Sequence, residues 1–349
     1  MNFIILNYRD PLFSVLVLVF LVITVAVANK IIEKIKANKQ KRKITSFIKS
    51  FEIGKKTAAY KDFLLDKEQK TSSLALLASL KSRQGEYEEA IRIYLDLLEI
   101  LIDKQSKIEI MVMLGQTYFK VGFLQRSKTI LLEAIKLIPR NKKALYLLLV
   151  IYENLKDYKK ANEVIDVLAE IGENMQKQKS AAKILEIINN PKLSNDKKTL
   201  GVVECLKQDK NIERLAFEYL SSFATEDFWK NIKEEQVLDL IDILWNFEKS
   251  SIDFSMVENS MLLQEIYSAK GYINTADKSE IFELDLILNL KDKQKAELKF
   301  EYLCTECNNN FPLAFYRCPM CQAIFSSSIN LSLIKPQNKE QNGSSAGFY

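Results

Sequence analysis

Four of the five cysteines lie within eighteen residues, as two Cys-x2-Cys pairs separated by ten residues. They are Cys304, Cys307, Cys318 and Cys321. One Cys-x2-Cys turn supplies two sulfurs from a tight loop, and two such turns that face each other complete a tetrahedral metal site. A segment of about twenty residues buries too little apolar surface to fold alone, so the ion would supply its folding free energy. The spacing therefore predicts a small four-cysteine ribbon at residues 300–330 that holds one zinc ion.

Other interpretations of these cysteines remain open from sequence. Thiolates bind iron as well as zinc, and spacing does not separate the two ions. An iron site would make this a redox protein, coloured when oxidised, whereas the zinc form is colourless. A pair of disulfides would require an oxidising compartment, and chance grouping is the last alternative. Cys205 stands far away in a helical stretch and is expected to be a small buried apolar residue.

The composition favours helices and gives no sign of an enzyme. The 349 residues are 48% hydrophobic, with only 9 Gly and 6 Pro, which is too few chain breakers for an all-β protein. The absence of histidine excludes Ser-His and Cys-His catalytic pairs and histidine-ligated metals. The sequence contains no Gly-x4-Gly-Lys phosphate loop and no dinucleotide fingerprint. We expect a non-enzymatic protein.

An uncharged apolar stretch occupies Pro11 to Ala28. A helix of this length spans about 27 Å, just enough for the hydrocarbon core of a bilayer. Positive residues follow it rather than precede it, which places the bulk of the chain in the cytoplasm. Residues 1–29 are thus predicted to be a single-pass anchor in the cytoplasmic membrane. The alternative is a cleaved signal peptide, since Ala26-Val-Ala28 resembles a small-x-small cleavage site.

A basic segment follows the apolar stretch. Residues 30–49 carry a net charge of +7, whereas the whole chain carries +5. The remainder is slightly acidic, which disfavours nucleic acid as a partner because phosphate contacts need clustered Lys and Arg. Residues 30–43 are predicted to be a juxtamembrane linker whose patch contacts anionic lipid headgroups. The patch consists of Lys30, Lys34, Lys36, Lys39, Lys41, Arg42 and Lys43.

A period of about 34 residues begins at Thr71. Three units align, at residues 71–104, 108–141 and 142–175. Small residues recur at the eighth position, Ala78 and Gly115, and at the twentieth; Leu149 departs from this in the third unit. The turn position holds Gly85, Gly122 and Lys156. The pattern resembles the tetratricopeptide repeat, a helix-turn-helix unit that stacks into a solenoid. The alternative is an ordinary helical bundle with accidental periodicity.

The predicted solenoid spans residues 44–290, although the repeat signature decays after 175. Helical apolar spacing predicts further helices near 177–189, 196–208, 211–223, 233–248, 255–270 and 276–289. These are expected to form degenerate pairs, each covering its neighbour's apolar face. The polar residues 335–349 are predicted to be a disordered tail.

A tetratricopeptide solenoid lines a concave groove with the first helix of each pair, and such a groove binds a peptide or another protein. The plain alternative is a solvated helix face. The groove residues predicted from the second and third units are Glu109, Gln116, Phe119, Lys120, Tyr146, Glu153 and Asn154.

The order of parts resembles the lipopolysaccharide assembly protein B family of Gram-negative bacteria, which combines a membrane anchor, tetratricopeptide repeats and a terminal rubredoxin-like ribbon. In that ribbon Cys-x2-Cys is followed after ten residues by Cys-Pro-x-Cys, as in Cys318-Pro319-x-Cys321 here. Phe315 and Tyr316 stand where the family has aromatics. Asn308 replaces the family's usual Gly after the second cysteine, and Tyr316 replaces its Trp. Asn tolerates the left-handed backbone that such a turn needs.

The resemblance implies an all-α protein with a small β hairpin at the metal, anchored in the inner membrane with its bulk in the cytoplasm. Members of the family modulate lipopolysaccharide synthesis by presenting the lipid A deacetylase to a membrane-bound ATP-dependent protease, and are linked to lipopolysaccharide transport proteins. By this resemblance the ribbon would pack against the repeats. The alternative function is a membrane-tethered scaffold for another envelope complex, with a purely structural zinc ion.

Overall fold

The computed structural model describes residues 69–336, with side chains from residue 71 onward. The predicted anchor, the basic patch and all of the predicted tail beyond residue 336 lie outside this range. Within it, no helix is long and apolar enough to cross a membrane. The chain divides into two compact units, the first ending at Ile100 and the second beginning at Leu101.

The described part of the first unit is one helix pair, α3 (Gln69–Gln84) and α4 (Tyr87–Ile100). Gly85 joins the two helices with φ of 87°, a left-handed conformation that costs least for glycine. Ala78 and Ala90, the small positions of the repeat, are both fully buried. The predicted helix-turn-helix of the first repeat is therefore present.

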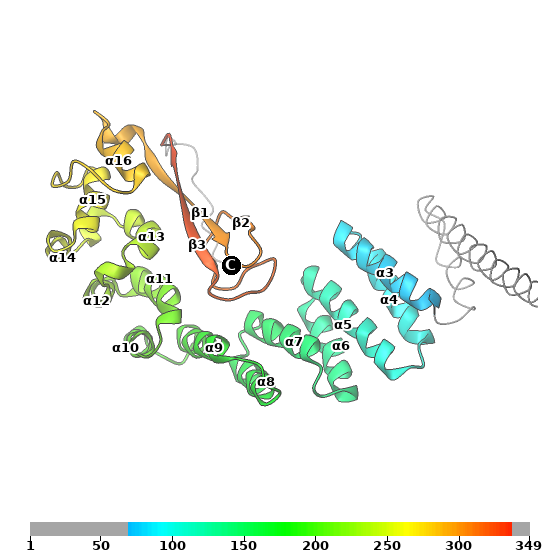
Figure 1. The fold of residues 1–349 in the computed structure, drawn as a ribbon. Helices are drawn as coiled ribbons and strands as arrows, with labels where there is room; N and C mark the ends of the chain where they lie inside the picture. Colours follow the sequence, from blue (N-terminus) through cyan, green and yellow to red (C-terminus); the bar gives the residue numbers. More distant parts are fainter. Residues whose placement is uncertain (1–68, 337–349) are drawn as a thin grey trace, which may run out of the picture. The chain divides into compact units, whose positions relative to one another are not determined.

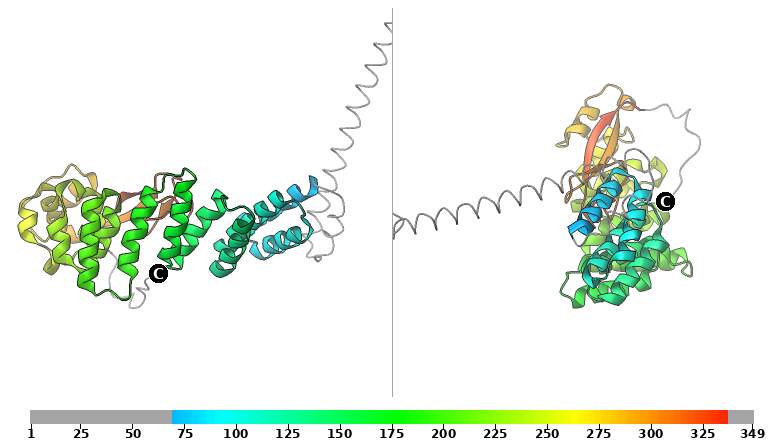
Figure 2. Two further views of the ribbon diagram at one scale, coloured as in Figure 1. Left: turned by 90° about the horizontal axis from the view of Figure 1, so that it is seen from below. Right: turned by 90° about the vertical axis from the view of Figure 1, so that its right-hand side faces the viewer.

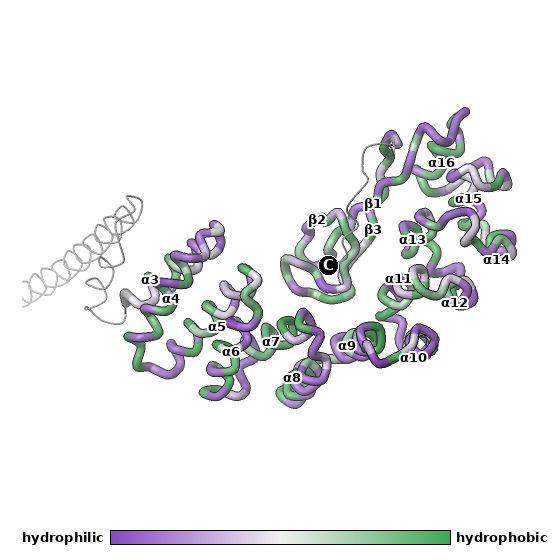
Figure 3. The backbone as a smooth tube through the Cα atoms, turned by 180° about the vertical axis from the view of Figure 1, so that it is seen from behind, coloured by the Kyte–Doolittle hydropathy of each residue, from purple (hydrophilic) through white to green (hydrophobic). Residues whose placement is uncertain are grey.

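The second unit begins with three more helix pairs (Figure 1): α5 (Lys104–Lys120) with α6 (Leu124–Leu137), α7 (Lys142–Asn154) with α8 (Tyr158–Glu170), and α9 (Gln176–Asn189) with α10 (Asn195–Gln208). The aligned turn positions Gly122 and Lys156 both have positive φ, of 85° and 56°. The tube in Figure 3 changes between hydrophobic and hydrophilic colours within the helices, as expected of amphipathic helices that stack. The green helices run side by side in the left view of Figure 2.

Close packing within the second repeat rests on Gly115 of α5 and Ser127 of α6. The Ser127 hydroxyl donates to the Gly115 carbonyl at 2.6 Å in a buried position. A Cβ added at Gly115 would lie 2.9 Å from Leu131 of the same partner helix. The small residues at these two repeat positions thus let two helices meet directly, as the sequence predicts.

After α10 the helices become shorter than predicted. The predicted helix 211–223 is present as η1 (Lys210–Ile212) followed by α11 (Glu213–Phe223), whereas α12 (Thr225–Asn231) was not predicted. The predicted helix 233–248 is instead η2 (Glu234–Gln236), η3 (Leu238–Leu240) and α13 (Ile241–Asn246). Gln236 explains the interruption, because its buried side chain accepts from Lys233 N and donates to Glu213. Tertiary hydrogen bonds of this kind override helical spacing.

The predicted helices 255–270 and 276–289 also differ from the structure. A short η4 (Lys249–Ser251) and α14 (Phe254–Glu258) precede α15 (Met261–Ala269). The Ser260 hydroxyl caps α15 by accepting from Leu263 N at 3.1 Å, which starts a new helix. The last helix is shorter than predicted, α16 (Phe282–Leu288). The residues before α16 do not continue the helix, because the N–H groups of Thr275 and Ala276 donate to Ser268 Oγ.

An aromatic core joins these short helices. The ring centroid of Phe228 lies 5.2 Å from that of Phe217 and 5.0 Å from that of Phe247. Trp229 is buried beside them, and its indole N–H donates to the Ser251 carbonyl at 2.8 Å. Both tryptophans are buried, so they serve the core, as expected from sequence.

The chain ends, within the described residues, in a three-stranded antiparallel sheet that follows a short η5 (Lys293–Lys295). Its strands are β1 (Glu297–Cys304), β2 (Asn310–Phe311) and β3 (Ser327–Ile334), in the order β2-β1-β3. The sheet is larger than the predicted hairpin, because β3 pairs with the full length of β1. Leu298 belongs to the core of the short helices, and Ile329 and Leu331 pack against it. The sheet and the second half of the solenoid thus share one core.

Valine at position 115 should destabilise the second unit. Because its side chain would collide with Leu131, we expect Gly115→Val to lower the free energy of unfolding by about 1–3 kcal/mol. The measurement is the urea midpoint of the full chain. The control is Gln116→Val at the exposed neighbouring position. We expect this variant to change the free energy of unfolding by less than about 0.7 kcal/mol. Equal effects of the two variants would show that the close approach at Gly115 is unimportant.

Candidate metal centre

The two Cys-x2-Cys turns have the same backbone geometry. The Asn308 N–H donates to the Cys304 carbonyl at 2.8 Å, and the Gln322 N–H donates to the Cys318 carbonyl at 3.0 Å. Asn308 and Gln322, the residues after the second cysteine of each pair, have φ of 54° and 63°. Non-glycine residues seldom adopt this left-handed region, and Asn308 occupies it as the sequence predicts. Two equivalent turns therefore present their sulfurs to one point.

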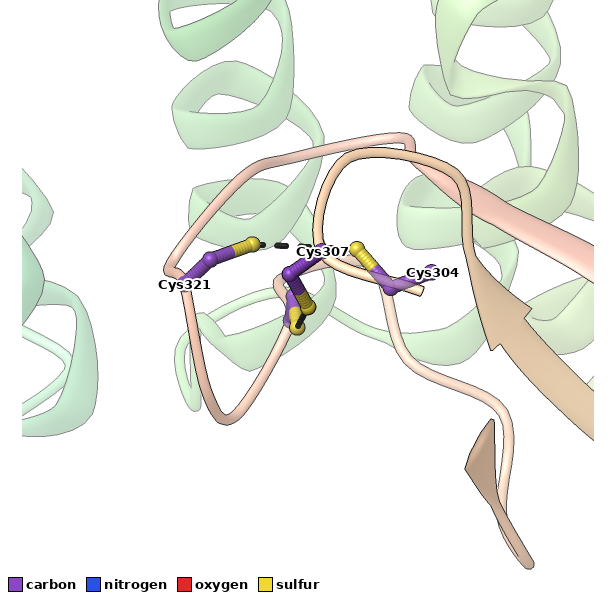
Figure 4. A group of neighbouring side chains, drawn as sticks. Cys304, Cys307 and Cys321 are labelled. Atoms are coloured by element: carbon purple, nitrogen blue, oxygen red, sulfur yellow. Dashed lines mark hydrogen bonds between the residues drawn. The ribbon is translucent and has the colours of Figure 1, made fainter. Parts of the chain in front are cut away.

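The four sulfurs converge with tetrahedral spacing. All four ligand atoms lie within 4.8 Å of one another, and Figure 4 shows the labelled Cys304, Cys307 and Cys321 side by side at the tip of the ribbon. The distances from Cys304 Sγ to Cys321 Sγ and from Cys307 Sγ to Cys318 Sγ are both 3.7 Å. A tetrahedron with metal–sulfur bonds of about 2.3 Å has edges of about 3.8 Å. The cluster therefore fits one metal ion, and these separations exceed the disulfide bond length of about 2.05 Å.

Hydrogen bonds favour thiolates in part of the cluster. Burial acts to raise the pKa of Cys304, but the Ser326 hydroxyl at 3.3 Å and backbone N–H groups of the same turn outweigh it and lower the pKa to about 6. The Asn309 side chain donates to Cys307 Sγ at 3.2 Å, and this bond lowers the pKa of Cys307. Burial, together with contacts to the other sulfurs, raises the pKa of Cys321 to about 12. A bound cation would remove this last barrier to four thiolates. Soft sulfur donors of this kind fit zinc or iron.

A buried ion pair fixes the second turn of the ribbon to the solenoid. Arg317, directly before Cys318, binds Glu153 of α7 with two hydrogen bonds of 2.8 and 2.7 Å. The side chains are only 10% and 1% exposed. Arg317 also donates to the Gln322 carbonyl at 2.9 Å, within the same turn. The guanidinium therefore ties the metal-binding turn to helix α7 through a bidentate pair.

A second polar network fixes the first turn. Tyr302, two residues before Cys304, donates to Asp242 of α13 at 2.6 Å. Asp242 is buried and also binds Arg214 of α11 with both carboxylate oxygens. The Arg214 guanidinium lies 5.5 Å from the Tyr302 ring centroid. Burial and the bond to Asp242 raise the pKa of Tyr302, so its hydroxyl stays protonated and donates.

The predicted groove residues have different environments. Glu109, Gln116, Lys120 and Asn154 are exposed, and Phe119 and Tyr146 are half-buried. The Tyr146 hydroxyl donates to Glu173 at 2.8 Å. Glu153 departs from the prediction, because it lies beneath the chain's own ribbon instead of facing a partner. Its pair with Arg317 spans 164 residues of sequence, which helical spacing does not reveal.

Sequence reasoning missed Arg317, Tyr302 and Asp242. A signal was present, since Tyr302 and Tyr316 each stand two residues before the first cysteine of a pair. Tyr316 approaches the same carboxylate as Arg317, with its hydroxyl 3.5 Å from Glu153. An acidic residue within an apolar helical stretch, as at position 242, is the matching signal on the solenoid.

Comparisons with known proteins identify the repeats. The tetratricopeptide-repeat model matches residues 71–100 and 108–141. No curated protein sequence matches the chain. A solved structure of MamA from Desulfovibrio magneticus RS-1 is similar at 18% identity, over 47% of this chain and 90% of that one, with a TM-score of 0.36. A tetratricopeptide repeat protein from Parabacteroides merdae is similar at 18% identity, over 57% and 83%, with a TM-score of 0.35. The match to the family model shows that the chain contains tetratricopeptide repeats, and the helix pairs described above form a mostly helical solenoid.

Loss of one cluster cysteine should abolish metal binding. Because three thiolates leave the tetrahedral site incomplete, we expect Cys304→Ser to reduce bound zinc plus iron from one ion per chain to well below one. Elemental analysis of the purified full chain measures both metals. The control is Cys205→Ser, which removes a buried cysteine outside the cluster and should retain one ion. Full metal content in Cys304→Ser, or none in the unmodified chain, would contradict the site.

Removal of the Arg317 guanidinium should weaken the attachment of the ribbon to the solenoid. Because Glu153 would remain buried without its partner, Arg317→Ala is expected to destabilise the second unit by about 3–5 kcal/mol. Urea unfolding followed by tryptophan fluorescence measures the change. The control is Lys136→Ala, which breaks an exposed pair with Glu133 and should cost less than about 1 kcal/mol. A Glu153→Leu, Arg317→Leu double variant should lose less stability than Arg317→Ala alone, because it leaves no buried charge unpaired. A larger loss of stability in the double variant would argue against the ion pair.

Proposed function

We propose that this protein is a non-enzymatic adaptor that binds other proteins through its tetratricopeptide repeats. The observation that carries the proposal is the use of the metal ribbon as a packing element on a repeat solenoid. Four cysteine sulfurs leave no coordination position for a substrate, and both turns are fixed by Arg317 and Tyr302 to carboxylates of the solenoid. The four-cysteine centre is thus suited to a structural role.

The surface available to partners is narrower than the whole predicted groove. In the second unit, the ribbon covers Glu153 at the end of α7. Gln116 and Lys120 of α5 remain exposed, and Phe119 beside them is half-buried. A mixture of polar, basic and aromatic side chains on one helix is suited to peptide recognition. The α5 face is therefore the part of the predicted groove that we assign to a partner.

The more specific proposal is an adaptor at the inner membrane that modulates lipopolysaccharide synthesis. It rests on the likeness to the lipopolysaccharide assembly protein B family: an apolar stretch, a basic segment, repeats and a four-cysteine ribbon in that order. The left-handed Asn308 supports it, since the replacement of the family's Gly preserves the turn. The clients would be the lipid A deacetylase and a membrane ATP-dependent protease, or lipopolysaccharide transport proteins.

The proposed location follows from the same likeness. Residues 1–29 would span the cytoplasmic membrane once, and the patch from Lys30 to Lys43 would contact anionic headgroups. The repeats and the ribbon would then lie in the cytoplasm, where a reducing environment keeps cysteines available to a metal.

Deletion of the gene should change the abundance of the deacetylase. If the protein presents this enzyme to the protease, its loss should stabilise the enzyme and raise lipopolysaccharide by several-fold. Immunoblots of the deacetylase and an assay of lipopolysaccharide in deletion and complemented strains measure both. Unchanged levels of both would refute the specific proposal.

Crosslinking in intact membranes distinguishes an adaptor for lipopolysaccharide synthesis from a scaffold for another envelope complex. A photo-reactive residue at position 116 should capture the protease, the deacetylase or a transport protein, whereas the same residue at exposed position 200 on α10 serves as the control. Capture of a different envelope protein would favour a scaffold for another complex. Capture of no protein would contradict the adaptor role itself.

A further inference from the structure

The sheet has one long open edge. In the order β2-β1-β3, strand β3 pairs only with β1. The Thr305 N–H donates to the Ser326 carbonyl at 2.8 Å, and these two residues continue the register of β1 with β3. They therefore form a hydrogen-bonded pair, and such pairs alternate along an antiparallel ladder. The backbone groups that point away from β1 then belong to Ser327, Ile329, Leu331 and Leu333.

These outward groups have no backbone partner among residues 69–336. Their N–H and C=O groups recur every second residue, at a spacing of about 6.8 Å. An unpaired row of this kind is a template for another strand. Ser327, Ile329 and Leu331, three of the four residues, also line a cavity of about 440 Å³. Three residues that carry the unpaired backbone groups thus belong to the lining of this cavity.

The cavity lies between the sheet edge and the short helices of the second unit. In Figure 1, β3 is the strand on the side of α11 and α13. The wall opposite β3 is formed by residues of α11 and η3, including Leu238, which is 51% exposed. Phe315, Tyr316 and Phe325 of the ribbon also line it. We call this volume the β3 groove. One side is formed by the edge strand, and the other combines the exposed Leu238 with polar and charged side chains of Lys210, Asn211, Glu213, Arg214, Gln236 and Asp239.

One of the three left-handed residues of the ribbon, Phe325, lies at this groove. Phe325 has φ of 52°, a conformation that is an outlier for a bulky side chain. Its N–H donates to the Tyr316 carbonyl at 2.8 Å, which holds it in place. Strain of this kind persists only where the surroundings fix it, and it gathers at functional sites. Here it turns the chain from the second cysteine turn into β3 and brings the ring to the groove.

We propose that the β3 groove binds an extended segment of a partner protein as a fourth strand of the sheet. The segment would exchange backbone hydrogen bonds with Ile329 and Leu331, and alternate aliphatic side chains would contact Leu238 and Phe325. Strand addition to an open edge is an established mode of peptide recognition. The inference deepens the adaptor role and rests on it for the existence of a partner protein, but it places binding away from the α5 face.

The dimensions favour a single strand over other occupants. A cavity of about 440 Å³ falls in the range of about 300–1,000 Å³ that holds a drug-sized ligand, which is room for one short extended segment. A small molecule would use one or two of the backbone groups. A strand uses the full row, since its own groups repeat with the same spacing.

The test uses peptides selected against the full chain. A phage library of random twelve-residue peptides is panned on the zinc-loaded, detergent-solubilised protein, and dissociation constants of selected peptides are measured by fluorescence anisotropy. N-methylation along a peptide removes one N–H at a time. Because a strand bonds to β3 through alternate residues, methylation at every second position should weaken binding at least tenfold, and methylation between them should have little effect.

Two exposed leucines give a matched pair of protein variants. Leu238→Glu replaces the exposed apolar side chain of the wall opposite β3 with a charge and should weaken binding at least tenfold. Leu200→Glu, on α10 and 70% exposed, should not change it. Ile329→Pro removes one outward N–H, which an edge strand tolerates, and should also weaken binding. Metal content and thermal midpoint show that each variant is folded.

Each outcome decides the proposal. Alternate N-methyl sensitivity together with loss in Leu238→Glu supports it. Peptides that bind equally well to Leu238→Glu, or a library that yields none, overturn it without affecting the adaptor role, which the crosslinking at position 116 tests. Peptides that bind only after the chain is shortened at Pro336 overturn it as well, because the chain's own residues 337–349 would then be the occupant.

Discussion

The buried carboxylate of Glu153 is the constraint on which the second unit depends. A side chain that is 1% exposed is strongly unfavourable as a charge unless a partner compensates it. Arg317 is that partner, and it stands directly before the metal ligand Cys318. The guanidinium also binds the Gln322 carbonyl, so one side chain contacts both the cysteine turn and Glu153. The second cysteine turn and the repeat helix thus stabilise each other across 164 residues of sequence.

The same arrangement occurs at both turns, which couples metal binding to docking. Tyr302 precedes Cys304 by two residues and binds Asp242, and Tyr316 precedes Cys318 by two residues and approaches Glu153. A single ion bound at the four cysteines would order both turns at once, so the conformational entropy of two docking contacts would be lost in one binding step. A ribbon without its metal would have to order each turn separately. This explains how a small sheet is positioned accurately on helices far away in sequence.

The sequence predicted local features well and long-range contacts poorly. Cysteine spacing, the turn residues Gly85 and Gly122, and the left-handed Asn308 depend on a few neighbouring residues, and all were predictable. Glu153 was predicted to line the partner groove because its position in the repeat lies on that face of the helix. In the structure its carboxylate pairs instead with Arg317 of the ribbon. The interrupted helices after residue 233 depend on Gln236, whose hydrogen bonds are tertiary. Burial of a polar side chain depends on which distant segment covers it, and periodicity carries no information on that.

The metal centre also determines what the sheet edge offers. Ser326 stands directly before β3, and its hydroxyl contacts Cys304 Sγ at 3.3 Å while its carbonyl accepts from Thr305. A slip of one residue in the β1–β3 register would reverse which backbone groups and side chains face the β3 groove. Because Ser326 is held at the sulfur cluster, such a slip would break two contacts next to the ion. An ion bound at the four cysteines would therefore fix the alternation of the edge that Ile329 and Leu331 present, although it has no open coordination position of its own.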